Sequence, residues 1–404
     1  MKIAYLAPEI PALSATFVYK EILALQQLNV DVRCFSVHSP DSVASGVELA
    51  ALKESVSTLY NSSKVTVIKA HFSHILKAPI IYLCTLNKLI SDVFSVGLFS
   101  RNALGLVFRF FYAGYLAKQL TDQECQHLHI HFAHVPTDIG MYAASLAKIP
   151  FSVTAHANDI FERGWLLKEK VERCAFFATI SEFNRRYLLG LDVDANKLKI
   201  VRCGVDAGQF STRKNFVSAK RVKIGTVGRL VEKKGVDTLI KAMALIKQQG
   251  LDCDLLIAGS GPLSSELNQL VEQLKLSATE VQFLGAMPHT EVAGFITSLD
   301  VFVLPCKQDS NGDMDGVPVV LMEAMLSGVP VISTELSGIP ELIINEQTGL
   351  LVQPNDDKAL ANAVVQMLSD KDLRVEMQAK AIDKVNHEFS LLGNAEKLKN
   401  LFVS

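Results

Sequence analysis

The chain has 404 residues, 49% of them apolar, and a formal net charge of −2 at pH 7. That length exceeds what one hydrophobic core usually supports, so we expect two domains. The near-neutral charge argues against a nucleic-acid-binding protein. The seven cysteines include no C-x-x-C pair, which argues against a zinc site and a disulfide framework and fits a reducing cytoplasm.

Strand and helix patterns alternate from the start of the chain. Residues 3–7 (IAYLA) and 30–37 (VDVRCFSV) read as buried strands, and residues 16–28 between them have the apolar spacing of a helix. This alternation continues to the end and predicts an α/β protein with parallel sheets. The loop after the first strand contains no G-x-G-x-x-G, which disfavours an NAD-type enzyme. Pro8 and Glu9 interrupt the first apolar run, so it suits a strand better than a signal peptide.

Residues 71–118 have an unusual composition, with many large apolar side chains and five Lys or Arg opposed only by Asp92. Their charge-free runs are well short of the roughly 20 residues that span a bilayer, so we expect no transmembrane helix. Two interpretations remain open. These helices either make peripheral contact with the inner membrane, on its anionic lipid, or only cover the sheet of the first domain.

Histidines mark the end of the predicted first domain's central strands. In HLHIHFAH, His127, His129 and His131 fall on one face of a strand, because side chains alternate. No neighbouring carboxylate is apparent, so a metal site is disfavoured. The strand 151–155 ends at His156, and Asp159 follows in the next turn, where α/β proteins place their sites.

A polar, weakly periodic segment at 207–220 predicts the linker to the second domain. The next strand ends at Arg229, and Lys234 follows just before a helix. An Arg fork and a Lys charge suit a diphosphate, although a solvated turn is the alternative for two adjacent lysines. Residues 259–261 (GSG) form a further glycine-rich turn, but Ser264 breaks the dinucleotide fingerprint.

The stretch 309–341 (DSNGDMDGVPVVLMEAMLSGVPVISTELSGIPE) carries the most specific chemistry. It follows an apolar strand, and Pro318 and Gly328 mark the two ends of a helix. The helix N-terminus at Gly316, Val317 and Val319 predicts a cradle for phosphate, and Glu323, one turn further, suits ribose hydroxyls. The acidic loop fails the calcium-binding EF-hand pattern in either register.

Asp315 and Glu323, in an acid-x7-acid spacing followed by EAMLSGVPVIST and SGIPELI, resemble the donor-site motif of retaining GT-B glycosyltransferases of the group 1, family 4 type. Asp315 stands where this family normally has Glu. The segments HIHFA, TISEFNRRYL and GDMDGVPVVLMEAM are similar to segments of exopolysaccharide or colanic-acid-type transferases. The resemblance covers nearly the whole chain in order.

The resemblance implies two Rossmann-like domains with parallel sheets that face each other across a cleft. It implies an acceptor-binding domain at 1–206, the linker at 207–220, a nucleotide-sugar domain at 221–385 and a C-terminal helix at 386–404 that crosses back.

The resemblance also implies roles for single residues. His156 would lie beside the reacting sugar carbon, although Ala157 replaces the usual Gly, and Asp315 would bind a sugar hydroxyl. Arg229 and Lys234 would bind the diphosphate. The nucleoside would meet Leu284, Gly285 and Glu323, and the acceptor side would include Ser14, Thr16, His131, Asp159 and Ser181.

We therefore expect a retaining hexosyltransferase that needs no metal and no cofactor beyond its nucleotide-sugar donor, which we expect to be UDP-linked. Its acceptor would be a saccharide or a polyprenyl-linked saccharide, and it would act in the cytoplasm or at the cytoplasmic face of the membrane. Two alternatives share these features: a nucleotide-sugar epimerase of the same fold, and a non-catalytic nucleotide-sugar sensor.

Overall fold

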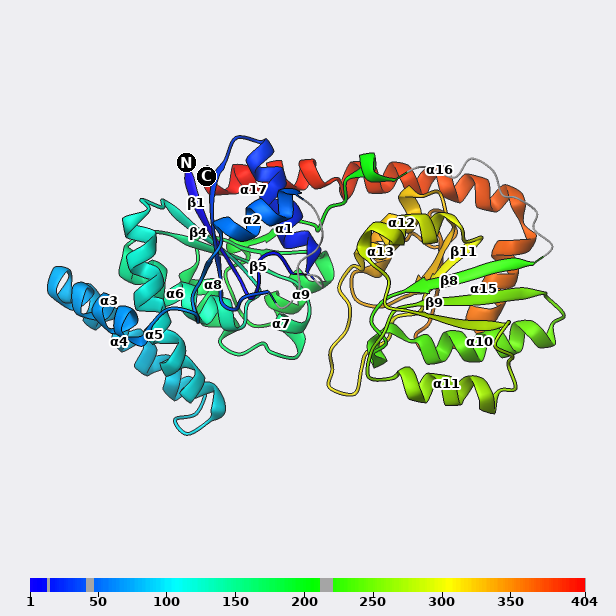
Figure 1. Ribbon diagram of the computed structural model, residues 1–404, viewed down its shortest axis with the longest axis horizontal. Coiled ribbons are helices and arrows are strands. Elements are labelled where there is room, and N and C mark those ends of the chain that lie inside the picture. The colour runs from blue at the N-terminus through cyan, green and yellow to red at the C-terminus, as the bar shows by residue number, and fades with distance from the viewer. Residues whose placement is uncertain (13–14, 41–46, 211–220, 404) are drawn as a thin grey trace. The chain divides into compact units, whose positions relative to one another are not determined.

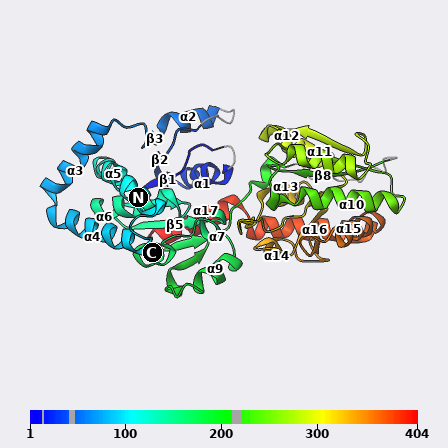
Figure 2. The ribbon, with the colours of Figure 1, turned by 90° about the horizontal axis from the view of Figure 1, so that it is seen from below.

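The computed structural model describes residues 1–12, 15–40, 47–210 and 221–403. The chain separates into two compact units (Figures 1 and 2). The first consists of Met1–Arg202 and Asn394–Ser404, and the second of Cys203–Gly393. Helix α17 (Leu391–Val403) therefore begins in the second unit and ends in the first.

The first unit is built on a sheet that, within the described residues, has seven parallel strands in the order β3-β2-β1-β4-β5-β6-β7. The strands are β1 (Lys2–Ala7), β2 (Asp31–Ser36), β3 (Ser57–Thr58), β4 (His127–His131), β5 (Phe151–Ala155), β6 (Phe177–Thr179) and β7 (Leu198–Ile200). The central strands β4 and β5 are buried along their full length, which explains their continuous runs of core residues.

Helices connect these strands, as parallel pairing requires. Those wholly in the first unit are α1 (Thr16–Gln27), α2 (Val47–Ser55), α3 (Lys64–Lys77), α4 (Pro79–Ser95), α5 (Arg101–Asp122), α6 (Val135–Ala147), α7 (Asn158–Phe161), α8 (Leu167–Arg173) and α9 (Glu182–Leu189). Helix α5 packs against α6, and α3 and α4 pack against α5. Helices α3, α4 and α5 thus form a subassembly at the outer side of this unit (Figures 1 and 2).

The second unit has a sheet of six parallel strands among the described residues, in the order β10-β9-β8-β11-β12-β13. They are β8 (Val222–Val227), β9 (Cys253–Ala258), β10 (Val281–Gly285), β11 (Val301–Leu304), β12 (Val331–Thr334) and β13 (Leu350–Val352). The helices are α10 (Val236–Gln248), α11 (Ser264–Gln273), α12 (His289–Thr297), α13 (Val319–Leu326), α14 (Ile339–Leu342), α15 (Asp357–Ser369) and α16 (Lys371–Glu388).

Strand β11 shows how helices cover both faces of this sheet. Val301 and Val303 belong to one apolar core, which includes residues of α10 and α15. Phe302 and Leu304 belong to a second core on the other face, which includes residues of α13. Alternate side chains of a strand point to opposite faces, so β11 needs apolar residues at every position. The prediction of an α/β protein with two parallel sheets is confirmed.

Candidate functional site

The C-terminal edge of the second sheet collects most of the residues predicted to bind a donor. Strands β10, β9, β8 and β11 are parallel neighbours, so their C-terminal ends lie side by side. At this edge the Gly259 amide donates to the Gly285 carbonyl at 2.7 Å. A Cβ on Gly259, whose φ is +146°, would lie 1.8 Å from the Gly228 carbonyl oxygen. The turns after β8 and β9 and the end of β10 are therefore in close backbone contact.

Lys234 is brought to the same edge by a short turn, Glu232–Lys234, that ends at Gly235. Gly235 has a φ of +65°, and a Cβ there would lie 1.9 Å from the Pro305 carbonyl oxygen. Only glycine allows this approach. As a result the turn lies against the end of β11, where the acidic loop begins.

Lys234 forms an ion pair with Asp315, with Nζ 2.6 Å from Oδ2. Burial by itself lowers the pKa of Lys234, but the Asp315 and Asp313 carboxylates and the Cys306 thiol outweigh it and raise the pKa above its ordinary value. Burial likewise raises the pKa of Asp315, and Lys234 and Lys233 reverse this, so the net pKa of Asp315 is lowered. The ion pair therefore keeps the Lys234 ammonium charged in a largely desolvated environment.

The partners that hold this pair were not among the predicted site residues. Lys233 Nζ lies 2.7 Å from Asp313 Oδ2 and 3.6 Å from Asp315 Oδ1. The thiol of Cys306 donates to Asp315 Oδ2 at 3.4 Å. The sequence did contain a signal for these partners. Lys233 directly precedes Lys234, and Asp313 stands two residues before Asp315 in the same acidic loop.

The acidic loop is folded by its own first carboxylate. Asp309 Oδ1 accepts hydrogen bonds from the backbone amides of Asn311 and Asp313, each at 2.9 Å. Glu232 Oε2 accepts from the amide and hydroxyl of Ser310 at 3.1 and 3.0 Å. These contacts give the loop carboxylates structural roles within the protein.

Helix α13 begins directly after this loop. Pro318 is its N-cap residue, and no side chain caps the helix, so the first amides of α13 have no side-chain acceptor. Gly316 and Val317 lie in the turn just before it. Gly328, with a φ of +68°, follows the end of the helix as predicted. Glu323 lies on α13 and is 4% exposed.

Two further predicted residues at this edge remain open to solvent. Leu284, on β10, is 44% exposed. Arg229 follows β8 and is exposed, and its guanidinium makes no hydrogen bond or ion pair with any described residue. An exposed fork of five N–H donors beside a charged lysine is a suitable receptor for phosphate oxygens.

In the first unit, His127, His129 and His131 lie on one face of β4, as predicted. His127 Nε2 lies 2.7 Å and His129 Nδ1 2.8 Å from the Ser152 hydroxyl on β5. The opposite face of β4 presents Leu128 and Ile130 to the apolar core. The histidine face is thus a polar layer between β4 and the elements that cover it.

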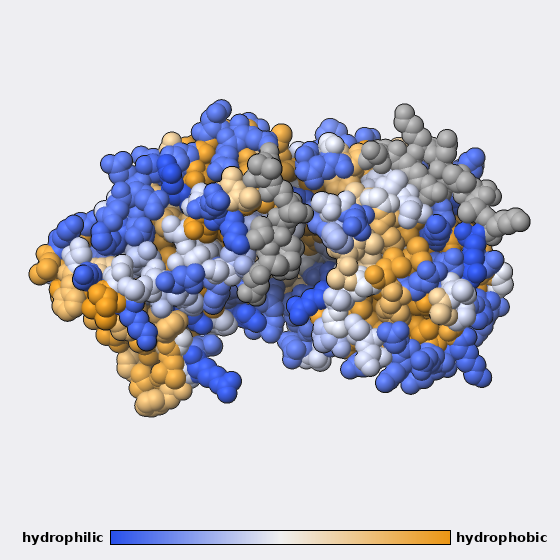
Figure 3. All heavy atoms as spheres, in the orientation of Figure 1, coloured by the Kyte–Doolittle hydropathy of each residue, from blue (hydrophilic) through white to orange (hydrophobic). Residues whose placement is uncertain are grey.

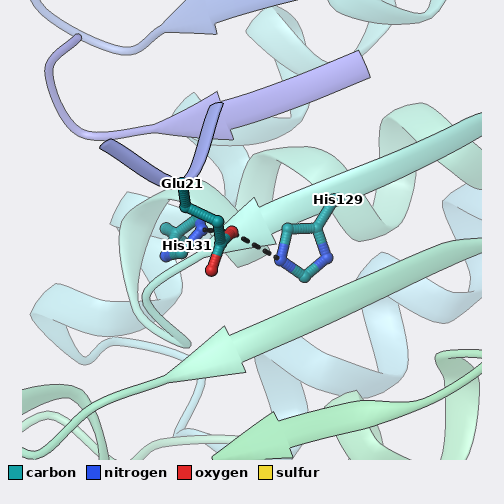
Figure 4. Close-up of side chains that lie close together, drawn as sticks. All are labelled: Glu21, His129 and His131. Atoms are coloured by element: carbon teal, nitrogen blue, oxygen red, sulfur yellow. Dashed lines mark hydrogen bonds and ion pairs between the residues drawn. The ribbon is translucent and has the colours of Figure 1, made fainter. Parts of the chain in front are cut away.

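The expectation that no carboxylate accompanies these histidines is wrong. Glu21 of α1 places Oε1 2.9 Å from His131 Nε2 and 4.0 Å from His129 Nε2 (Figure 4). The Tyr5 hydroxyl also donates to this oxygen at 2.8 Å. Glu21 follows Phe17 by one helical turn, on the same face of α1, and this spacing was the only sequence signal for it.

Glu21, His129 and His131 are close enough to be considered as metal ligands, with ligand atoms within 4.8 Å of one another. Their donor atoms, however, already have hydrogen-bond partners. His129 Nε2 lies 3.0 Å from the Thr154 hydroxyl, and His131 Nδ1 lies 3.2 Å from His156 Nε2. A neutral imidazole has one donor and one acceptor, and these contacts use both nitrogens. The cluster is therefore complete as a hydrogen-bond network.

His156 follows β5 and is enclosed by aromatic rings. Its ring centroid lies 4.4 Å from that of Phe17 and 4.8 Å from that of Phe132. Burial, followed by the neighbouring His131 and His134, lowers the pKa of His156 well below its usual value. The imidazole is neutral at pH 7.

The predicted acceptor-side residues hold this loop together. Asp159 has no exposed surface, and it accepts hydrogen bonds from the amides of Ala133, His156 and Ala157 at 2.7, 3.0 and 3.0 Å. Ser181 is equally buried and caps α9, and the Asn184 side chain donates to the His156 carbonyl. Asp159 therefore contacts the backbone at His156 directly, and Ser181 contacts it only through Asn184. Thr16 begins α1, and Ser14 lies outside the described residues.

The chain matches two protein-family models. The family model "Glycosyltransferase Family 4" matches residues 14–209, and "Glycosyl transferases group 1" matches residues 209–384. WcaL of Escherichia coli (strain K12), a glycosyltransferase named for colanic acid biosynthesis, is 36% identical over 59% of this chain and 56% of its own. The amylovoran biosynthesis glycosyltransferase AmsK of Erwinia amylovora is 33% identical over 58% of this chain and 59% of its own.

A GDP-mannose-dependent alpha-(1-6)-phosphatidylinositol monomannoside mannosyltransferase of Mycobacterium tuberculosis (strain H37Rv) is 31% identical over 50% of this chain and 54% of its own. These matches span less than two thirds of each relative. Among solved structures, Anabaena HepE in complex with UDP has the same fold, with a TM-score of 0.74, 16% identity and full coverage of both chains. The chain belongs to the group 1 glycosyltransferases of family 4, with the GT-B fold.

Proposed function

We propose that this chain transfers a hexose, with retention, from a UDP-sugar to a saccharide or polyprenyl-linked saccharide during exopolysaccharide or cell-surface glycan biosynthesis in the cytoplasm. The observation that carries this proposal is the gathering of Arg229, the Lys234–Asp315 ion pair and the uncapped start of α13 at one sheet edge. Such a set suits the diphosphate and sugar of a nucleotide sugar.

In the proposed reaction, bond cleavage leaves negative charge on the departing nucleoside diphosphate. Arg229, Lys234 and the amides of Gly316, Val317 and Val319 stabilise this charge. Lys234, held by its ion pair with Asp315, and the backbone amides are fixed before the reaction begins, so their reorganisation costs little in the transition state. The raised pKa of Lys234 supports this role, because the residue stays protonated at neutral pH.

The two acidic residues receive separate roles. Glu323 accepts hydrogen bonds from the ribose hydroxyls, and its burial on α13 supports a fixed geometry. Asp315 binds a hydroxyl of the transferred sugar while it remains paired with Lys234. Leu284 and Gly285 border the nucleobase, which the 44% exposure of Leu284 supports.

His156 contacts the sugar near its anomeric carbon as a neutral hydrogen-bonding group. We propose that Glu21 and His131 orient it, because His131 touches both at 2.9 and 3.2 Å. Double displacement would require a carboxylate nucleophile about 5 Å from the acid. We assign no residue that role and propose instead that the leaving phosphate deprotonates the acceptor on the same face of the sugar.

The choice of nucleotide rests on the relatives. The HepE structures are titled as complexes with UDP and UDP-glucose, which supports a UDP-hexose. The mycobacterial relative is named as GDP-mannose-dependent, so GDP-mannose is the first donor to compare.

The test is a screen of UDP-, GDP-, ADP- and CMP-sugars with the purified chain, with and without EDTA and a membrane lipid extract. We follow both nucleotide release and sugar product. EDTA-resistant release of UDP that requires the extract, with sugar on an extract component, supports the proposal. A changed nucleotide sugar without acceptor indicates an epimerase, and tight binding without release from any donor, with acceptors of both classes present, indicates a sensor.

A further inference from the structure

Helices α3, α4 and the first half of α5, residues 64–111, form what we call the helical arm, all of which the structure describes. Fifteen of the twenty-one exposed large hydrophobic side chains found among the described residues lie on it. The most exposed are Leu76 at 81%, Ile80 at 75% and Phe99 at 92%, all at or next to the turns between the three helices. Hydrophobic side chains accordingly gather over α3, α4 and α5 in Figure 3. Soluble monomeric proteins rarely expose so many large hydrophobic side chains in one region.

The inner face of the arm holds polar side chains among apolar ones such as Leu89, Leu106 and Phe110. His71, Thr85 and Asp92 are buried, with exposed fractions of 6%, 0% and 0%. His71 Nε2 lies 2.9 Å from the Phe111 carbonyl oxygen, and its ring fills the space beside Gly114 on α5. A surface helix usually carries polar residues on its outer face, so fifteen large apolar side chains there depart from the usual pattern.

Strong contacts fix the orientation of α4. Both Oδ atoms of Asp92 lie 2.6 Å from the Arg173 guanidinium on α8, and the Tyr142 hydroxyl on α6 donates to Asp92 at 2.6 Å. Thr85 lies 2.9 Å from the Ser145 hydroxyl on α6. Rotating α4 to bury its apolar face would leave these polar groups unpaired in the interior, which is costly. The apolar face is therefore held outward.

The exposed charges of the arm all have one sign. Lys64, Lys69, Lys77, Lys88 and Arg101 are exposed, and no exposed acidic side chain occurs in 64–111. The one acidic residue there, Asp92, is buried and paired with Arg173. An apolar surface with only positive exposed charges is complementary to anionic lipid headgroups over an acyl interior.

A second copy of the chain is a poorer occupant. A two-fold symmetric dimer through this face would place the same five positive charges of each copy against each other. No helix among the described residues is long and apolar enough to cross a membrane. We propose that the helical arm docks on a bilayer rich in anionic lipid, with its turns at Leu76–Ile80 and Leu98–Phe99 in the interfacial region.

The test is co-sedimentation of the full chain with vesicles, without nucleotide sugar or acceptor, so that its result is independent of the proposed transfer reaction. We expect binding to vesicles with 30 mol % phosphatidylglycerol in phosphatidylcholine, and much weaker binding to phosphatidylcholine alone. High salt reduces the binding to anionic vesicles. Failure of the wild-type chain to bind either vesicle overturns the proposal.

A first variant pair tests the apolar turns. Leu76→Glu with Phe99→Glu changes two side chains with little contact to the protein, so the fold is retained, which thermal unfolding checks. We expect binding to fall on the order of a hundredfold, because two large side chains lose their apolar burial. The matched control, Val375→Glu with Val403→Glu, alters residues that are 52% and 71% exposed elsewhere and adds the same charge. Equal binding by both double variants contradicts the proposal.

A second pair tests the charges. Changing Lys64, Lys69, Lys77 and Arg101 to Gln removes the preference for anionic vesicles, at roughly fivefold per charge. Changing the exposed residues Lys275, Lys358, Lys371 and Lys397 to Gln alters the net charge equally and leaves the preference intact. Sedimentation velocity on the same proteins tests the alternative that a second copy of the chain occupies this face. A dimer that the Leu76→Glu, Phe99→Glu variant dissociates, together with no vesicle binding, assigns the face to self-association and overturns the proposal.

Discussion

Lys234 and Asp315 are 81 residues apart in the chain, and their side chains meet at 2.6 Å at the C-terminal edge of the second sheet. Each changes the ionisation of the other, since the carboxylate raises the pKa of the lysine and the lysine lowers that of the carboxylate. The carboxylate therefore keeps this half-buried ammonium charged.

We expect Asp315→Asn to make UDP binding pH-dependent. In the wild-type chain the raised pKa of Lys234 keeps it protonated up to at least about pH 9, so UDP affinity stays level between pH 7 and 9. Without the carboxylate, burial lowers the pKa of Lys234, and affinity falls as the pH rises through that window. Calorimetric titration with UDP measures this. Asp237→Asn, which removes the partner of Lys307, is the control and stays level. A level profile for Asp315→Asn refutes the electrostatic role.

We expect Glu323→Ala to lower the rate of sugar transfer by ~10²-fold or more, the scale seen when a group that organises an active site is lost. Steady-state release of nucleoside diphosphate measures it. Glu323 is only 4% exposed, so thermal unfolding must first establish that the variant is folded. Glu272→Ala, an exposed position on α11, is the matched control. Near-normal turnover of the folded Glu323→Ala variant would show that Glu323 is not part of the site.

Acid should destabilise the first unit through its buried histidines. Burial lowers the pKa of His127 to about 4, and burial together with Arg163, Lys170 and Arg109 lowers that of His134 to about 3. In the folded state these histidines therefore stay neutral at pH values at which the same side chains already bind protons in the unfolded chain. The free energy of unfolding is therefore unaffected by these histidines above about pH 6.5. It falls as the pH drops toward 4, by on the order of 3 kcal/mol for each histidine.

Urea unfolding between pH 7 and 4 checks this. His127→Gln should give a shallower loss of unfolding free energy with falling pH, because one of the buried histidines no longer titrates. His387→Gln alters an exposed histidine and should leave the slope unchanged. Identical slopes for all three proteins would falsify the assignment.

Metal removal should change neither stability nor turnover. The nitrogens of His129 and His131 are already paired with Ser152, Thr154, Glu21 and His156, so a cation would have to displace these contacts. We expect the same Tm for the purified chain with EDTA, without additive and with added zinc. A Tm that EDTA lowers and zinc restores, and that is insensitive to both in Glu21→Gln, would instead establish a metal site at Glu21, His129 and His131.

Local patterns in the sequence predict much of this architecture. Alternating strand and helix signals give both parallel sheets, and Pro318 and Gly328 mark the limits of α13. The period of two along β4 places its three histidines on one face. Each of these depends on neighbours within a few residues, where backbone geometry and burial act directly.

Long-range contacts are what the sequence does not reveal. Glu21 reaches His131 across 110 residues, and one helical turn from Phe17 is the only local trace of that contact. The helical arm is a second case, because its composition suits either a lipid surface or a cover for the sheet. The choice depends on which side chains are exposed, and fifteen large apolar ones are exposed on the arm.

Calorimetric titration of UDP tests the proposal that the C-terminal edge of the second sheet binds the donor diphosphate. We compare the wild-type chain with Lys234→Met and with Lys247→Met, which removes a lysine paired with Glu280 instead. We predict that the wild-type chain and Lys247→Met bind UDP alike, and that Lys234→Met binds at least about tenfold more weakly, as for loss of one charged hydrogen bond. Equal affinity of all three proteins would contradict the claim.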